Sequence, residues 1–121
     1  MEILGPDQQL MEAALQVRSA RAAILAGNVA NADTPGYIGR DLDFDRALAE
    51  QLSAVRSATD QAPNFTAVMR ADGVEALRPD GNNVDLNQQL ARSYQNSLDY
   101  VATLKLYGDS VGRLRSATTT S

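Results

Sequence analysis

Two segments of helical period, one at each end of the chain, constrain the fold more than any other feature. In the first, apolar and small residues recur every three or four positions, which predicts a helix over residues 7–32. A second row of the same period, from Leu90 to Leu114, predicts a helix over residues 85–116. The chain has 121 residues, enough for one small domain, and its middle is too short to cover both rows. We therefore expect a single, mainly α domain whose two long helices form a coiled-coil-like layer and also meet neighbouring copies.

Four polar residues interrupt the first row: Arg18, Arg21, Asn28 and Asn31. One interpretation is that they pair across copies, because a polar residue on such a seam can set register at a cost in stability. The other is that their side chains reach the rim of the helix contact. A helix packed only within its own small domain would rarely carry four such residues, but both interpretations stay open.

A short helix is predicted after the first long one. Its apolar residues share one face, and Asp41 or Asp43 is placed to cap its start. The apolar residues are Phe44, Leu48, Leu52 and Val55. The alternating aspartates superficially match a calcium loop, but Arg46 stands where that loop needs glycine and Leu52 where it needs glutamate. We therefore expect no metal site.

A small β-hairpin completes the middle segment, residues 33–84. Its strands are predicted between Phe65 and Arg78, with Asp72 and Gly73 at the turn. A hairpin of this size is marginal by itself, so it must pack against another element.

The second long helix has a marked start and an ambiguous end. Asp85 is placed to cap it, with Gln88 three residues further on as in a capping box. Gly108 and Gly112 lie four residues apart near its end. Either the helix weakens there, or its backbone approaches a neighbouring helix closely.

Several kinds of chemistry are absent from the composition. The chain has no histidine and no cysteine, so the usual general base, thiol nucleophile and soft metal ligands are missing. The remaining acidic candidates lie where helix caps and turns are expected: Asp33, Asp41, Asp43 and Asp45. A net charge of −4 argues against nucleic acid, and no phosphate-binding glycine motif occurs. We expect no catalytic residue, no cofactor and no nucleic-acid partner.

The segment 28–37 closes the first helix with a turn of defined geometry. Thr34 precedes a proline and is pushed into an extended conformation. Pro35 and Gly36 then fit the two central positions of a type II turn, where the second residue needs φ > 0.

This segment resembles the N-terminal signature of the bacterial flagellar axial proteins, the rod, hook and hook-associated subunits. Residues 40–44 resemble the B-type proximal rod proteins of that family, and residues 82–86 with the following helix resemble their C-terminal segment. The resemblance covers both terminal helices, and it is weak between about residues 53 and 79. It implies a structural subunit, not an enzyme. It also implies subunit-packing roles for six residues: Asn28, Asn31, Thr34, Pro35, Gly36 and Tyr37.

The same resemblance implies where the protein works and with what. The expected assembly is a hollow helical shaft that transmits torque and conducts exported subunits. The expected partners are other copies, other rod subunits, and the adaptor and membrane-ring proteins at the base. The chain has no cleavable signal or membrane-spanning stretch, which by itself indicates the cytoplasm. The resemblance instead implies the periplasmic rod of the basal body, reached through the flagellar type III export pathway.

Two alternatives accompany this interpretation. Within the family, the C-type proximal rod protein is the runner-up. Outside it, the chain is a soluble helical adaptor or secretion chaperone, which would be a folded oligomer of closed symmetry. Circular dichroism on dilution separates these classes, since an adaptor stays helical while a rod subunit is expected to lose helix as its ends unfold.

Overall fold

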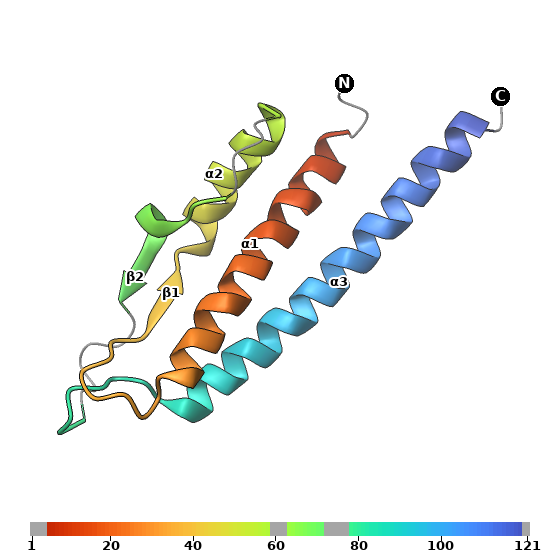
Figure 1. Cartoon of the computed structure of the whole chain (residues 1–121). Coiled ribbons are helices and arrows are strands. Elements are labelled where there is room, and N and C mark those ends of the chain that lie inside the picture. The colour runs from red at the N-terminus through yellow and green to blue at the C-terminus, as the bar shows by residue number, and fades with distance from the viewer. Residues whose placement is uncertain (1–4, 59–62, 72–77, 120–121) are drawn as a thin grey trace.

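Three α-helices lie side by side, and a pair of short strands is placed beside one of them. The structure is a computed structural model that describes residues 5–58, 63–71 and 78–119. In chain order its elements are α1 (Pro6–Ala30), β1 (Arg40–Leu42), α2 (Phe44–Arg56), the 3-10 helix η1 (Thr66–Val68), β2 (Met69–Ala71) and α3 (Leu86–Thr119). Figure 1 shows α1 between α2 and α3, so the predicted layer of long helices is present.

The helix starts follow from local chemistry. Pro6 stands in the first turn of α1, where a missing N–H costs nothing, and Asp7 lies at the positive end of the helix dipole. Asp43 caps α2 by accepting a hydrogen bond from the backbone of Arg46, which settles the choice between the two predicted caps. Asp85 does the same for α3, accepting from the Gln88 backbone N–H at 3.2 Å.

The small sheet differs from the predicted hairpin in its pairing. Strand β2 pairs antiparallel with β1, with Leu42 opposite Met69. Most of the strand predicted to follow β2 lies outside the described residues. The predicted turn at Asp72 and Gly73 lies outside the described residues. The pairing with β1 is favoured because it brings Leu42 and Val68 into the core, where they are 2% and 1% exposed.

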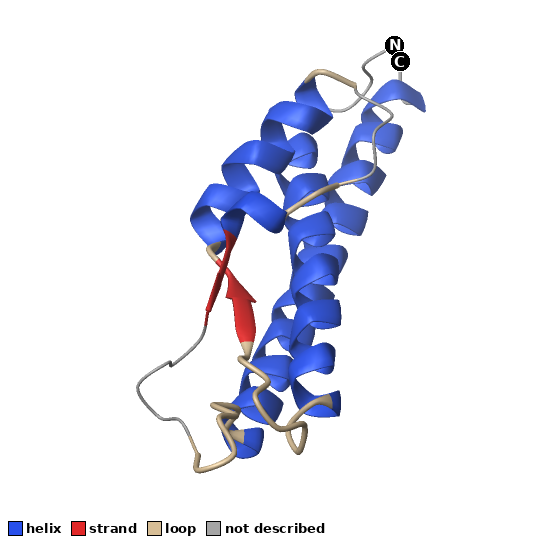
Figure 2. Cartoon of the chain, turned by 60° about the vertical axis from the view of Figure 1, so that its left-hand side comes forward, coloured by secondary structure: helices blue, strands red, loops and turns tan. Residues whose placement is uncertain are grey.

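The apolar core lies on one side of α1 only. It joins α1, α2, β1 and the segment around η1 through Val17, Leu42, Ala47, Phe65 and Val68. Figure 2 shows α2 and the two strands covering this side. The first helix therefore has a conventional hydrophobic contact with α2, which anchors the middle segment to it.

The contact between α1 and α3 has a different character. The two helices run antiparallel, with the start of α1 and the end of α3 at the same end of the molecule (Figure 1). The buried residues of α3 are polar: Gln89, Asn96 and Ser110. The layer predicted as coiled-coil-like is thus held by hydrogen bonds along its seam, and most large apolar side chains of α3 face away from it. Among the described helices, none combines the length and the hydropathy that a membrane crossing requires.

Candidate functional site

The turn that ends the α1 segment has the predicted geometry. Gly36 adopts φ 75°, and the Tyr37 backbone N–H donates to the Thr34 carbonyl at 3.2 Å. This bond closes a four-residue turn with Pro35 and Gly36 at its centre. The Gly36 N–H also donates to the Asp80 carbonyl at 2.9 Å, so the turn is fastened to the loop that precedes α3.

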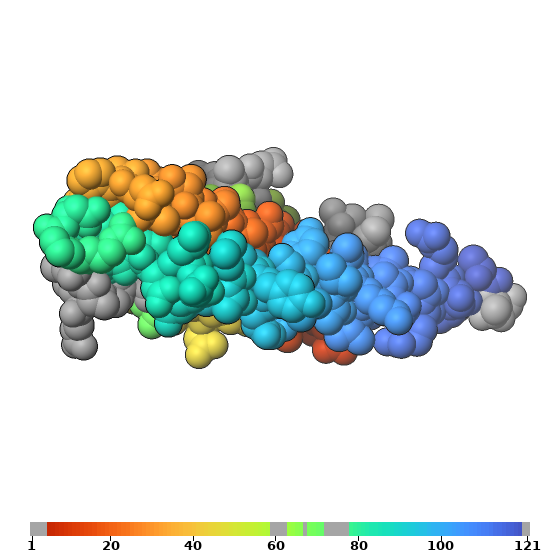
Figure 3. All heavy atoms as spheres, turned by 90° about the horizontal axis from the view of Figure 1, so that it is seen from below, coloured from red at the N-terminus to blue at the C-terminus, as the bar shows by residue number. Residues whose placement is uncertain are grey.

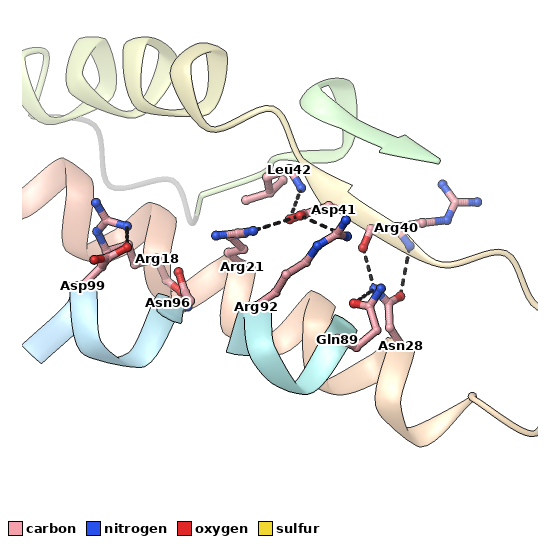
Figure 4. Close-up of polar contacts among 10 residues, drawn as sticks. All are labelled: Arg18, Arg21, Asn28, Arg40, Asp41, Leu42, Gln89, Arg92, Asn96 and Asp99. Atoms are coloured by element: carbon pink, nitrogen blue, oxygen red, sulfur yellow. Dashed lines mark hydrogen bonds and ion pairs between the residues drawn. The ribbon is translucent and has the colours of Figure 1, made fainter. Parts of the chain in front are cut away.

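Asn28 joins three elements at this end of the molecule. Its side chain is fully buried, and its amide donates to the Arg40 carbonyl at 2.6 Å and to Gln89 Oε1 at 3.0 Å. Its Oδ1 accepts from the Arg40 backbone N–H at 3.0 Å and from the Tyr37 hydroxyl at 3.2 Å. Figure 4 shows the contacts with Arg40 and Gln89. One side chain thereby connects α1, β1 and α3, with every polar group satisfied.

Asn31 acts more locally. Its amide donates to the Gly27 carbonyl at 2.8 Å, and its Oδ1 accepts from the Thr34 hydroxyl at 3.1 Å. The structure therefore brings Asn28 together with Tyr37, and Asn31 together with Thr34. Thr34, Pro35 and Gly36 are themselves exposed, at the tip of the loop.

Asn82 is a key residue that sequence reasoning did not single out. Its amide donates to the carbonyls of Asn31, Ala32 and Thr34 at 2.9, 3.1 and 2.8 Å, and it is fully buried. These include carbonyls left without intrahelical partners where α1 ends. Its Oδ1 accepts from the Val84 N–H at 2.7 Å. The available signal was the string at residues 82–86 that carries the family resemblance.

A buried ion pair links α1 to β1. Both oxygens of Asp41 accept from the Arg21 guanidinium, at 2.9 and 3.0 Å, and Arg92 of α3 lies 3.9 Å away. Burial by itself raises the pKa of Asp41, but the Arg21 hydrogen bonds, the Leu42 N–H and the charges of both arginines outweigh it, so the pKa is lowered. Figure 4 shows this cluster between the three elements.

The four polar residues of the α1 row therefore have partners inside the chain. Besides the contacts above, Arg18 pairs with Asp99 of α3 at 3.4 Å, and its guanidinium lies 4.6 Å from the centre of the Phe44 ring. Pairing across copies stays a prediction. We expect a helix within one small domain to carry four such residues only rarely, yet Arg18, Arg21 and Asn28 all have partners within the chain. The reason is that α3 and β1 present complementary polar groups at matching heights.

The outer face of α3 is apolar and uncovered. Five large side chains on it are between 48% and 68% exposed: Leu90, Tyr94, Leu98, Val101 and Leu104. Figure 3 shows one face of the molecule on which α3 runs along the length of the particle with nothing laid across it. Contiguous apolar surface of this kind marks interaction sites. We call these five residues the α3 outer row.

The two glycines near the end of α3 lie in open space. A Cβ added at Gly108 or Gly112 would meet no atom within 4 Å. Among the described residues, no other helix packs closely against either glycine. Of the two predicted alternatives, a close helix approach here would therefore need a helix of another molecule.

The arrangement suits binding of other chains more than chemistry on a small molecule. In the described part of the chain, no group of three histidine, cysteine, aspartate or glutamate side chains could hold a metal ion. Of the acidic candidates, Asp41 is engaged by Arg21 and Asp43 caps α2.

Comparison with known proteins agrees with this character. Residues 11–37 match the family described as flagella basal body rod protein. The flagellar basal body rod protein FlgB of Aeromonas hydrophila is 37% identical over 113 residues, covering 86% of each chain. FlgB of Escherichia coli K12 is 32% identical over 79% of this chain and 80% of its own, and FlgB of Bacillus subtilis is 24% identical over 98% of each. The chain therefore belongs to the FlgB family of flagellar basal body rod proteins.

Proposed function

We propose that this chain builds the proximal part of the flagellar rod by laying the α3 outer row against neighbouring subunits. The observation that carries this proposal is the size and exposure of that row. Tyr94 is 68% and Val101 63% exposed, on the longest helix of the chain. Full burial of such a side chain is worth about 1.5–3 kcal/mol, so covering five half-exposed ones supplies several kcal/mol for association.

The polar contacts between α1 and α3 also support this proposal. Hydrogen bonds and ion pairs between α1 and α3 hold the two helices in one relative position, with Asn28 and Gln89 at one end and Arg18 and Asp99 nearer the other. Directional bonds of this kind specify a geometry better than apolar contact does. A stiff pair of helices is a suitable unit for a shaft that carries torque.

The assembly that follows is an open one. A contact between two different surfaces of identical subunits propagates and does not close unless the rotation happens to complete a ring. Repeated around an axis it gives a helical tube, with a channel for exported subunits. In this proposal residues 1–121 act as one unit, and the exposed tip at Thr34, Pro35 and Gly36 is a further subunit contact that Asn28, Asn31 and Tyr37 hold in place.

The proposed partners are other copies, other rod subunits, and the adaptor and membrane-ring proteins at the base. The proposed location is the periplasmic part of the basal body, reached by type III export without a cleaved signal. The similarity to FlgB proteins along most of the chain supports this account over a C-type rod protein or a soluble adaptor.

Deletion of the gene, followed by electron microscopy of purified basal bodies, tests the proposal. The expected result is membrane rings without a rod, in non-motile cells that the intact gene restores. Complete basal bodies in the deletion strain would overturn the proposal.

A further inference from the structure

The layer formed by α1 and α3 has one side that no other described element covers. The strands lie on its other side, where Arg92 of α3 reaches Asp41 of β1 at 3.9 Å. On the uncovered side, Ser19 of α1 and Val101 of α3 line the same open cavity, so the two helices present one continuous surface. We call this surface the free face. It consists of the α3 outer row and five exposed small residues of α1, which recur every three or four positions: Ser19, Ala22, Ala23, Ala26 and Ala30.

The free face carries no charge over most of its length. Between residues 86 and 104 of α3 the charged residues are Arg92 and Asp99, and between residues 19 and 30 of α1 the one charged residue is Arg21. All three are engaged by partners inside the chain. Because covering an uncharged surface requires no desolvation of ions, the free face suits contact with another protein surface.

The register of the two helices sets large residues level with small ones. Asn28 donates to Gln89 at 3.0 Å, and Arg18 pairs with Asp99 at 3.4 Å, so ten residues back along α1 match ten residues forward along α3. The same count sets three members of the outer row level with small residues of α1. These pairs are Leu90 with Gly27, Tyr94 with Ala23, and Leu98 with Ser19.

We propose that two free copies of this chain pair through their free faces, about a two-fold axis parallel to the helices. Each copy then lays its α3 outer row over the small residues of α1 in the second copy. Such an axis leaves heights unchanged, so Tyr94 of each copy lies over Ala23 of the other. Large side chains over small ones let two helices approach closely. The four long helices run alternately up and down, as in helix bundles.

Two charged residues at the edge of the free face complete the match. Lys105 lies one residue beyond the outer row, and the register sets it level with Glu12. Glu12 keeps the period of the small α1 residues, because it stands seven positions before Ser19. Within the described part of the chain, neither Lys105 nor Glu12 has an ion pair. In the two-fold pair, Lys105 of each copy meets Glu12 of the other, which makes the two surfaces complementary in charge.

The size of the free face fits a weak and reversible pair. Residues 86–104 span roughly 27 Å, and two adjacent helices are together roughly 20 Å wide. The face therefore covers about 540 Å², which is below the about 800 Å² on each partner of a stable interface. The pair is also closed, because both copies use the same face and neither offers it to a third.

The pair hides the outer row of the free chain. A contiguous row of large apolar side chains on an unassembled chain is liable to aggregate, and pairing removes that surface from water. In the rod the same row contacts neighbouring subunits, so the pair has to separate before a copy is incorporated. This last step rests on the proposed function, whereas the pairing of the free chain does not.

Sedimentation equilibrium of the purified full chain tests the pairing. The expected result is a reversible exchange between monomer and dimer as the concentration rises. Ala26→Arg places a charge on the free face and is expected to raise the dissociation constant by about tenfold. The matched control is Ala49→Arg at an exposed position of α2, which should leave the dissociation constant unchanged. A chain that stays monomeric, or that grows past the dimer without stopping, would overturn the proposal.

A charge exchange tests the register. Lys105→Glu and Glu12→Lys should each weaken the dimer by about two- to fivefold at low salt, and the double variant should restore it. Circular dichroism at the same concentrations checks that each variant keeps the helix content of the parent. A double variant that dimerises no better than the single ones would show that this register is wrong.

A single cysteine distinguishes a two-fold pair from contacts between unlike surfaces. The parent chain has no cysteine, and Ala22 lines the cavity between α1 and α3, close to the proposed axis. A bis-maleimide should therefore join two Ala22→Cys chains to each other, and it should not join two Ala49→Cys chains. Absence of the Ala22 cross-link in the dimer would overturn the two-fold arrangement. Because these experiments use the free chain, their failure leaves the proposed function standing, and complete basal bodies in the deletion strain would overturn that function without affecting the pairing.

Discussion

Replacing Arg21 by methionine would leave Asp41 buried without its bidentate partner, which makes this pair the most informative point to perturb. Methionine keeps much of the apolar stem, so the change removes charge and hydrogen bonds more than packing. Asp41 is only 2% exposed, and in the variant it retains the Leu42 N–H at 2.8 Å and Arg92 at 3.9 Å. Breaking a buried pair costs about 3–5 kcal/mol, and these remaining contacts place the expected loss near the lower end.

Urea denaturation followed by circular dichroism at pH 7 measures the loss, with several protein concentrations to separate folding from association. The matched control is Arg18→Met, whose partner Asp99 is 38% exposed. An ion pair to an exposed carboxylate is worth about 0–1 kcal/mol, to which the contact with the Phe44 ring adds about 0.5–1 kcal/mol. Equal losses of unfolding free energy in the two variants would refute the reasoning.

The pH dependence gives an independent check with a definite sign. The folded pKa of Asp41 is lowered from 3.8, so its contribution to stability is present above that value and is lost as the pH falls through the folded pKa. In Arg21→Met the pKa moves up, because burial is opposed by fewer contacts. The stability of the variant should therefore fall less than that of the parent between pH 5 and about pH 3. Parallel curves would show that Arg21 does not set this pKa.

Three further predictions follow from the loop end and the end of α3. Asn82→Ala should lower the unfolding free energy by about 2 kcal/mol, because it removes three hydrogen bonds to carbonyls near the end of α1 and leaves the buried Val84 N–H without its acceptor; thermal denaturation measures this, with the exposed Asn87→Ala as a neutral control. Gly36→Val should lower the unfolding free energy by about 1–3 kcal/mol, because valine resists the φ of 75° at this position. Swimming assays should show reduced motility, and normal swimming would count against the role of the turn. In the free chain, the backbone amides of residues 112–119, which are all exposed, should exchange their hydrogens without protection, while amides near Asn28 should be protected. We expect the end of α3 to become protected only on assembly, so protection along the whole of α3 in the free chain would contradict the prediction.

The parts of this protein that could be predicted from its sequence are those decided by neighbours in the chain. The period of apolar residues predicts both long helices, because a helix places every third or fourth residue on one face. Pro35 and Gly36 predict their turn, because proline fixes its own φ and glycine tolerates a positive φ, whatever surrounds them. Asp43 and Asp85 cap helices through bonds to N–H groups three residues away.

Only the tertiary structure determined which residues that lie far apart in the sequence become partners. Nothing in the spacing of Arg21 and Asp41 indicates that they form a buried pair. The sequence likewise does not show that β2 pairs with β1, because such pairings depend on which surfaces meet after the helices pack. The same holds for Asn82, whose three acceptors are about 50 residues earlier. For the polar residues in the α1 row, pairing across copies was one of two open interpretations, because the sequence does not show which surfaces of the same chain meet them. The folded chain gives three of them partners internally. It leaves the apolar face of α3 to other molecules, because α3 lies at the edge of the helix layer with α1 on one side only (Figure 1).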